Sequence, residues 1–174
     1  MTIEEIEQLV YDYGNDVYKF CCHLTLERDR ADELYQETFL KAVELRHKVN
    51  RSGNPKSYLL GISVNLWKNY VKKEKNRNRL VPKLDLEDGV EARAVSGEDI
   101  LDECVKKEML DTVKGLVSNL PEKQKMVVIL YYGQNLSTEE IGRILHIPKG
   151  TVMSRLSKAR ENLKKEMEAK GYEV

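Results

Sequence analysis

The stretch Leu136–Lys165, LSTEEIGRILHIPKGTVMSRLSKARENLKK, decides the fold of the C-terminal part of this 174-residue chain. Ser137 and Glu140 have the S-x-x-E spacing of a capping box, which predicts that a helix begins there. Pro148 disfavours helical geometry in the residue before it, so this helix ends and a second one begins near Lys149. Two helices joined by so tight a turn are typical of a helix-turn-helix, whose second helix enters the major groove of DNA.

The second of these helices has two faces of different chemistry. Apolar residues recur on one side at helical spacing: Val152, Leu156, Ala159 and Leu163. The other side carries hydroxyl, amide and basic groups that suit base edges and phosphates: Thr151, Ser154, Arg155, Lys158 and Asn162. An ordinary helical hairpin with a solvated basic face is the alternative interpretation of this segment taken alone.

The composition favours an all-α protein. Prolines number only four and alternating, strand-like runs are scarce. No apolar run approaches membrane-spanning length and the N-terminus, MTIEEIEQLV, is acidic, which indicates a cytoplasmic protein. Three cysteines, of which Cys21 and Cys22 are adjacent, make a poor disulfide framework. We expect core packing rather than a metal site at Cys21-Cys22-His23, because a second, spaced pair of ligands is missing.

Charge is segregated along the chain although it sums to zero. Residues 1–37 hold ten acidic and three basic residues, and residues 38–84 hold twelve basic and two acidic residues. Residues 85–104 are acidic again, with eight acidic residues against one basic residue. Basic segments can bind phosphate and acidic segments can face a basic partner, so the zero net charge does not exclude nucleic-acid binding.

Helical patterns flank an acidic segment that lacks such a pattern. The predicted helices cover residues 3–24, 29–47, 56–77, 98–119 and 123–132, followed by the helix-turn-helix. The first of them fits one helix or two helices broken near Gly14-Asn15. Residues 82–97 are acidic and poor in large apolar side chains, which is typical of a linker. We expect two small helical domains, residues 1–80 and 99–174, joined by a flexible acidic linker over residues 81–98.

Residues 66–79, LWKNYVKKEKNRNR, combine positive charge with aromatic side chains. The segment has six basic residues and one acidic residue, with Trp67 and Tyr70 interleaved. Basic groups beside aromatic rings are the combination that proteins use to hold unpaired bases. Burial in the core is the more common role for the two rings taken alone. Asn65 and Asn69 on a neighbouring helical face favour nucleic-acid binding.

These motifs, in this order, resemble bacterial sigma factors of the extracytoplasmic-function (ECF) group of the sigma-70 family. Residues 32–42, DELYQETFLKA, resemble the helix with which that family docks on the clamp of RNA polymerase. Residues 57–65, SYLLGISVN, resemble the start of the helix that reads the minus-ten promoter element. Leu120-Pro121-Glu122 and the helix-turn-helix resemble the domain that reads the minus-thirty-five element.

The resemblance implies an alternative sigma factor that binds the RNA polymerase core, through its beta and beta-prime subunits, and directs it to specific promoters. It implies promoter DNA, including unpaired minus-ten bases, and an anti-sigma factor as further partners, the latter able to hold the protein at the membrane. It implies no cofactor and no small-molecule substrate.

Three sets of candidate contact residues follow from the same resemblance. Contacts with the polymerase are expected at Asp32, Glu33, Gln36 and Glu37. Contacts with minus-ten DNA are expected at Asn50, Arg51, Tyr58, Asn65, Trp67, Lys68, Asn69, Lys72 and Lys73. Contacts with minus-thirty-five DNA are expected at Ser137, Thr138, Lys149, Thr151, Met153, Ser154, Arg155, Ser157, Lys158 and Arg160.

A stand-alone helix-turn-helix regulator whose N-terminal half dimerises is the alternative function. A dimerisation face is expected to be apolar, whereas residues 1–80 carry acidic and basic-aromatic rows. An enzyme finds no support, because His23, His47 and His146 are far apart and the chain has no nucleophile motif or phosphate-binding glycine loop.

Overall fold

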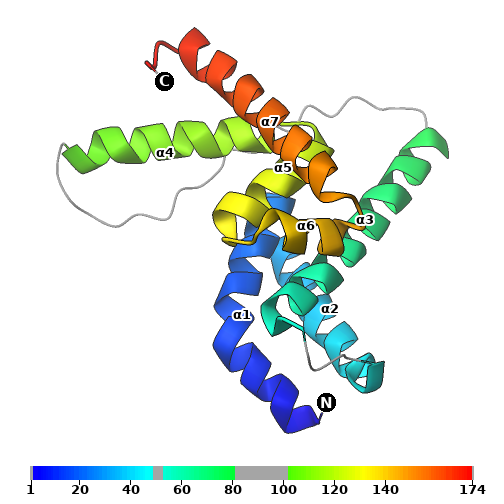
Figure 1. The fold of residues 1–174 in the computed structure, drawn as a ribbon. Coiled ribbons are helices and arrows are strands. Elements are labelled where there is room, and N and C mark those ends of the chain that lie inside the picture. The colour runs from blue at the N-terminus through cyan, green and yellow to red at the C-terminus, as the bar shows by residue number, and fades with distance from the viewer. Residues whose placement is uncertain (1, 49–52, 81–101, 174) are drawn as a thin grey trace.

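A computed structural model describes residues 2–48, 53–80 and 102–173, and the regular elements of this part of the chain are all helices, as the sequence predicts (Figure 1). The elements are α1 (Ile3–Thr25), α2 (Arg28–Glu44), a 3-10 turn η1 (Arg46–Lys48), α3 (Pro55–Leu80), α4 (Asp102–Ser118), α5 (Glu122–Val128), a π-helical turn η2 (Ile129–Gly133), α6 (Thr138–Leu145) and α7 (Lys149–Ala169). Within the described ranges, no helix is both long and apolar enough to cross a membrane. The predicted linker, residues 81–98, lies outside them.

Helix α1 is continuous, so the option of a break near Gly14-Asn15 is wrong. The helix starts with a capping box between Thr2 and Glu5 and ends where Leu26 takes a left-handed conformation. Gly14 is buried, and a Cβ atom there would lie 2.9 Å from the Tyr35 hydroxyl oxygen. The glycine therefore allows α1 and α2 to approach each other closely and does not interrupt the helix.

Helices α1, α2 and α3 form a three-helix bundle around Phe20, Leu34 and Leu59. Inside it, the buried hydroxyl groups of Thr38 and Ser63 lie 3.0 Å apart. Each also bonds a carbonyl oxygen of its own helix, at Leu34 and at Leu59. These bonds satisfy two polar groups that would otherwise destabilise the core.

The predicted helix-turn-helix is confirmed in α6 and α7. The capping box between Ser137 and Glu140 starts α6, and His146 ends it in a left-handed conformation. A Cβ atom at Gly142 would lie 2.8 Å from the Ile147 carbonyl oxygen, so only glycine allows this tight turn. The stripe predicted inside α7 is buried at Val152, Leu156 and Ala159.

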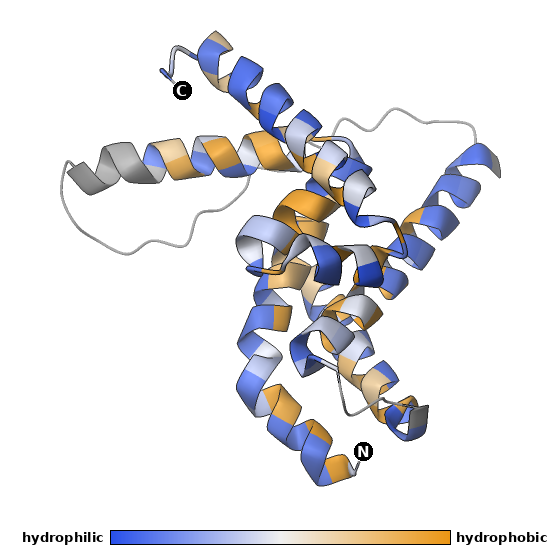
Figure 2. Ribbon diagram, in the orientation of Figure 1, coloured by the Kyte–Doolittle hydropathy of each residue, from blue (hydrophilic) through white to orange (hydrophobic). Residues whose placement is uncertain are grey.

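The two helical groups are packed against each other. Helix α3 contacts α6, and α1 contacts η2, so one apolar cluster runs from Leu59 in α3 to Leu130 in η2. Figure 2 shows the apolar residues gathered where these helices meet, whereas the far end of α3 is hydrophilic. Helix α4 extends to one side of the molecule (Figure 1). The expected domain boundaries stay a prediction.

Candidate polymerase and DNA interfaces

The predicted polymerase-docking residues lie on the outward side of α2. Glu33, Gln36 and Glu37 are exposed, whereas Asp32 is half-buried. The Tyr18 hydroxyl of α1 donates a hydrogen bond of 2.8 Å to the Asp32 carboxylate. This carboxylate raises the pKa of Tyr18 above its usual value, because deprotonation would destroy the bond. The face predicted to dock on the polymerase is therefore built by two helices.

A shallow cavity of about 390 Å³ lies between α1 and α2 at this face. Its lining includes Asn15 and Tyr18 from α1 beside Asp32 and Gln36 from α2. Sequence reasoning missed the two α1 residues because they belong to no motif. Their spacing could have placed them together, since Asn15 and Tyr18 are three residues apart and so share one face of a helix.

The predicted minus-ten row forms a polar face on the middle of α3. Its exposed members are Asn65, Lys68, Asn69, Lys72 and Lys73, which recur at helical spacing. Partial burial lowers the pKa of Lys68, and the positive charge of Arg155 on α7 lowers it further. Two cations that the sequence assigns to different promoter elements are thus close enough to repel each other.

The aromatic residues predicted to meet minus-ten DNA are turned inward. Trp67 is 9% exposed, stacks on Tyr70, and donates a hydrogen bond of 2.7 Å from Nε1 to Glu122. The guanidinium group of Arg30 lies 3.5 Å from the centre of the Tyr70 ring. The Trp67 ring is therefore not open to a stacking base in this arrangement.

Tyr58 is half-buried, and burial raises the pKa of its hydroxyl. Among the described residues this hydroxyl has no hydrogen-bond partner. The remaining two members of the predicted minus-ten set, Asn50 and Arg51, lie outside the described residues.

The outer face of the helix-turn-helix carries the predicted minus-thirty-five residues. Met153, Ser154, Ser157 and Lys158 are exposed on α7, and Thr151 and Arg155 are half-buried there. Thr138 is half-buried at the start of α6.

Several of these side chains already have partners within the protein. The Ser137 hydroxyl caps α6, and Lys149 pairs with Glu139, whose pKa this bond lowers to about 2. Lys158 lies 3.1 Å from Glu161. The predicted DNA contacts of these residues would have to compete with these bonds. For Ser137, the capping-box pattern in the sequence already indicated a structural role.

Arg160 is held against the π-helical turn. Its Nε donates a hydrogen bond of 2.7 Å to the Tyr132 hydroxyl, and its guanidinium group lies within 5.8 Å of the Tyr131 and Tyr132 ring centres. The side chain stays exposed. Sequence spacing gave no sign of this contact, because Tyr132 lies 28 residues earlier in the chain.

Comparisons with known proteins agree with this arrangement. The chain matches two family models in order, sigma-70 region 2 over residues 9–77 and sigma-70 region 4 over residues 110–163. It is 31% identical over 164 residues to the ECF RNA polymerase sigma factor SigM of Bacillus subtilis strain 168, covering 94% of each chain. It is 28% identical over 158 residues to SigW of the same organism, covering 89% of this chain and 84% of the relative.

Two solved structures share the fold. The sigma factor RpoE from Bartonella quintana, solved in complex with the anti-sigma factor NepR, has a TM-score of 0.73 at 23% identity, covering 95% of this chain and 98% of that chain. CnrH, solved with the cytosolic domain of CnrY, has a TM-score of 0.69 at 17% identity, covering 97% of this chain and 90% of that chain.

The chain therefore belongs to the sigma-70 family, in its ECF group, and the family predicted from the sequence is confirmed. It is an alternative sigma factor that directs RNA polymerase to promoters, and it is not an enzyme. A stand-alone helix-turn-helix regulator would not account for the match to sigma-70 region 2 in its N-terminal half.

Proposed function

We propose that this sigma factor uses three separate surfaces, with α2 binding the polymerase, α3 the minus-ten element and α6–α7 the minus-thirty-five element. Residues 1–80 and 99–174 form the two corresponding domains. The observation that supports this division is that the predicted polar rows lie on helix faces that the packing of the described helices leaves open. The two family matches cover the same helices in the same order.

The α2 surface suits a basic, polar partner. Glu33 and Glu37 bring exposed carboxylates, Gln36 brings an amide, and the bond from Tyr18 fixes the carboxylate of Asp32. Charges of one sign on an exposed face speed association with a partner of the opposite sign. We assign this face to the RNA polymerase core.

The α3 surface suits DNA with unpaired bases. The amides of Asn65 and Asn69 can donate and accept hydrogen bonds, as base edges require. Lys68, Lys72 and Lys73 lie along the same part of the helix and would hold the phosphate backbone, which makes the affinity dependent on salt.

On α7 we assign base contacts to Ser154, Ser157 and Lys158, which are exposed at the early and middle positions of the recognition helix. Arg155 and Arg160 are assigned to phosphates. The bond from Arg160 to Tyr132 would orient this guanidinium group toward the DNA backbone.

The test of the polymerase surface is co-purification with core enzyme. The triple variant Asp32→Ala, Glu33→Ala, Gln36→Ala is expected to lose the core polymerase while its helical content, measured by circular dichroism, stays intact. Glu108→Ala removes an exposed carboxylate from α4 and serves as the control. Retention of the core by the triple variant would contradict the assignment of α2.

We also propose an anti-sigma factor as a partner, because the structurally similar RpoE was solved with one bound. The sigma factor itself would reside in the cytoplasm, held at the membrane when such a partner is anchored there. Cell fractionation with a tagged chain tests this. The tag is expected in the membrane fraction while the sigma factor is held inactive, and in the cytosolic fraction after the signal that releases it. A tag that is cytosolic under every condition would contradict membrane retention.

A further inference from the structure

Tyr132 belongs to none of the predicted contact sets, yet it lies beside the face of α7 that is proposed to read DNA. Arg160 follows Ser157 by three residues and Met153 by seven, so these three exposed side chains share one face of α7. On this face the Tyr132 hydroxyl accepts a hydrogen bond of 2.7 Å from Arg160 Nε. Tyr132 is itself 55% exposed, so it adds to this face a side chain from outside the helix-turn-helix.

The level of this contact along α7 matches the edge of the major groove. Arg160 lies six residues after Ser154, which is about 9 Å along the helix axis. The major groove of duplex DNA is about 12 Å wide. If Ser154 meets the bases, the phosphate backbone that borders the groove is therefore reached at the level of Arg160 and Tyr132.

The Tyr132 hydroxyl still has a hydrogen to donate. A tyrosine hydroxyl can donate and accept hydrogen bonds at the same time. Among the described residues, its one hydrogen bond is the bond that it accepts from Arg160. Accepting a bond from a guanidinium group polarises the O–H, which makes it a better donor. A phosphate oxygen of DNA is an acceptor that suits this donor.

Arg160 also keeps its positive charge available for DNA. Its neighbour Lys158 lies 3.1 Å from the carboxylate of Glu161. Within the described part of the chain, no carboxylate forms an ion pair with Arg160, whose guanidinium group lies against the Tyr131 and Tyr132 rings instead. A cation and a hydroxyl that lie side by side are both common donors to phosphates.

The π-helical turn η2 brings Tyr132 to the surface. Tyr131 and Tyr132 follow the buried Val127 and Val128 by four residues, and in an undistorted α-helix residues four apart share a face. The turn over Ile129–Gly133 changes this repeat, and Tyr132 lies outside the core. The Tyr131 ring then packs edge-on against it, with ring centres 4.9 Å apart. Turns of this kind are rare and occur frequently at functional sites.

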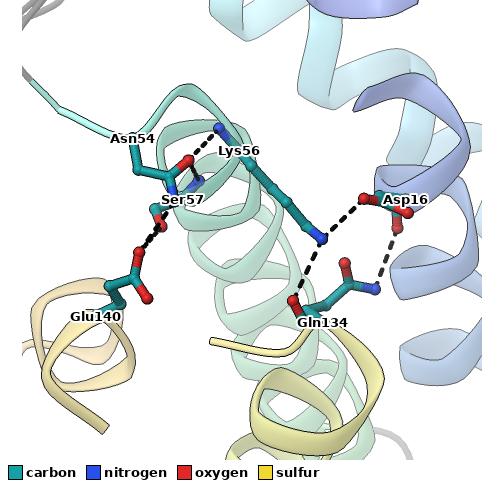
Figure 3. A network of polar contacts seen from close by, with 6 residues as sticks. All are labelled: Asp16, Asn54, Lys56, Ser57, Gln134 and Glu140. Carbon is teal, nitrogen blue, oxygen red and sulfur yellow. Dashed lines mark hydrogen bonds and ion pairs between the residues drawn. The ribbon is translucent and has the colours of Figure 1, made fainter. Parts of the chain in front are cut away.

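The chain is anchored directly after this turn (Figure 3). The Gln134 side-chain amide donates a hydrogen bond of 3.2 Å to the Asp16 carbonyl oxygen, and the Lys56 ammonium group donates one of 3.2 Å to the Gln134 carbonyl oxygen. Figure 3 shows the Gln134 side chain directed toward Asp16 of α1. In this structure these bonds hold the backbone two residues after Tyr132, so the hydroxyl has a defined position beside α7.

We propose that Tyr132 is a further contact with minus-thirty-five DNA, in which its hydroxyl donates to a phosphate oxygen while it accepts from Arg160. The Arg160 guanidinium group and this hydroxyl then bind the same stretch of backbone. Because phosphates carry no sequence information, the contact adds affinity and fixes the position of α7 without changing base preference. The proposal rests on the assignment of α7 and Arg160 to minus-thirty-five DNA made above.

The test measures DNA binding by the sigma factor in complex with core polymerase. The probe is a duplex that the unaltered complex selects from a randomised pool, beside a duplex of scrambled sequence. Tyr132→Phe keeps the ring and removes the hydroxyl, so it is expected to weaken binding to both duplexes about fivefold, as one lost hydrogen bond does. The slope of log affinity against log salt should stay the same, because the hydroxyl is neutral.

Tyr11→Phe removes an exposed hydroxyl from α1 and is the matched control, with affinity expected to stay unchanged. Urea denaturation followed by circular dichroism checks that both variants are as stable as the unaltered protein. Equal affinities of Tyr132→Phe and Tyr11→Phe would overturn the proposal. A loss confined to the selected duplex would also overturn it, since a phosphate contact acts on every sequence.

A double variant separates a direct contact from a positioning role. If the Tyr132 hydroxyl meets the backbone itself, Tyr132→Phe should weaken binding at least threefold in the Arg160→Ala background as well. Absence of any effect in that background would mean that Tyr132 acts only by orienting Arg160, and the direct contact would be refuted.

The same measurements distinguish this proposal from the assignment of Arg160. An unchanged salt slope in Arg160→Ala, together with weaker binding by Tyr132→Phe in both backgrounds, would refute the assignment of Arg160 and support the Tyr132 contact. A slope reduced by about one unit in Arg160→Ala, together with full affinity of Tyr132→Phe, would support the assignment of Arg160 and refute the Tyr132 contact.

Discussion

The Tyr18 hydroxyl of α1 donates a 2.8 Å hydrogen bond to the carboxylate of Asp32 on α2. The two residues are 14 positions apart, and the same tyrosine ring packs edge-on against Tyr35, with ring centres 5.6 Å apart. The bond gives Asp32 one fixed orientation at the edge of the proposed polymerase surface. Its carboxylate is therefore preorganised for a basic partner, which reduces the entropy lost on binding.

Replacing Tyr18 with phenylalanine removes this bond but keeps the ring packing. Tyr18→Phe is expected to weaken binding to core polymerase by about 1 kcal/mol, roughly fivefold, because Asp32 then has to be ordered on binding. Fluorescence anisotropy with labelled sigma factor measures the change. Tyr11→Phe on the exposed part of α1 is the matched control. Equal affinities for the two variants would contradict a positioning role of Tyr18.

Asn65 is expected to act in promoter melting. Asn65→Ala removes a side-chain amide from the exposed face of α3 without changing packing, so it should impair formation of the open complex. Binding to duplex minus-thirty-five DNA should be unaffected. Permanganate footprinting with core polymerase measures the unpaired bases, and Asn76→Ala near the end of α3 is the control. A normal footprint for Asn65→Ala would show that this amide does not hold a melted base.

Lys158 is expected to contact a base, whereas Arg160 is expected to contact a phosphate. Lys158→Ala should cost about 1–3 kcal/mol on the preferred minus-thirty-five sequence and broaden base preference at one position. Binding selections with randomised duplexes measure the preference. An unchanged preference would show that Lys158 contacts phosphate instead.

Arg160→Ala should weaken binding to all sequences alike and reduce the slope of log affinity against log salt by about one unit. Tyr132→Phe separates the charge of Arg160 from its orientation, because it removes the hydrogen bond to Arg160 and leaves the positive charge. We expect its salt slope to match that of the unaltered protein. A slope unchanged in Arg160→Ala would exclude a phosphate contact there.

The buried hydroxyl pair of Thr38 and Ser63 is expected to stabilise the N-terminal bundle. Thr38→Val keeps the shape but removes the bonds to Ser63 and to the Leu34 carbonyl, so the free energy of unfolding should fall by about 1–2 kcal/mol. Urea denaturation followed by circular dichroism measures it. Thr112→Val breaks the equivalent bond on the surface of α4 and should stay within about 0.5 kcal/mol. Similar losses in both variants would mean that burial does not matter here.

The order of the helices and the helix-turn-helix were predictable because they depend on residues close together in the chain. The ends were less so: α2 ends at Glu44 where the pattern predicted residue 47, and α3 runs to Leu80 where it predicted residue 77. The capping box joins Ser137 to Glu140 three residues later, and the apolar stripe of α7 repeats every three or four residues. The exposed polar residues of α2 and α3 were predictable from the same repeat of three or four residues. The role of Gly14 could not be predicted in this way, because it depends on the Tyr35 hydroxyl of another helix.

What the sequence by itself determined is therefore the family, the helices and the polar row on each of them, since periodicity and capping act within one or two turns. Only the tertiary structure decided which of these surfaces are covered. Trp67 donates a hydrogen bond to Glu122, 55 residues away, and Asn54 donates one to Glu140, 86 residues away. Such contacts depend on how complete helices pack, and packing joins surfaces whose spacing in the chain carries no periodic signal.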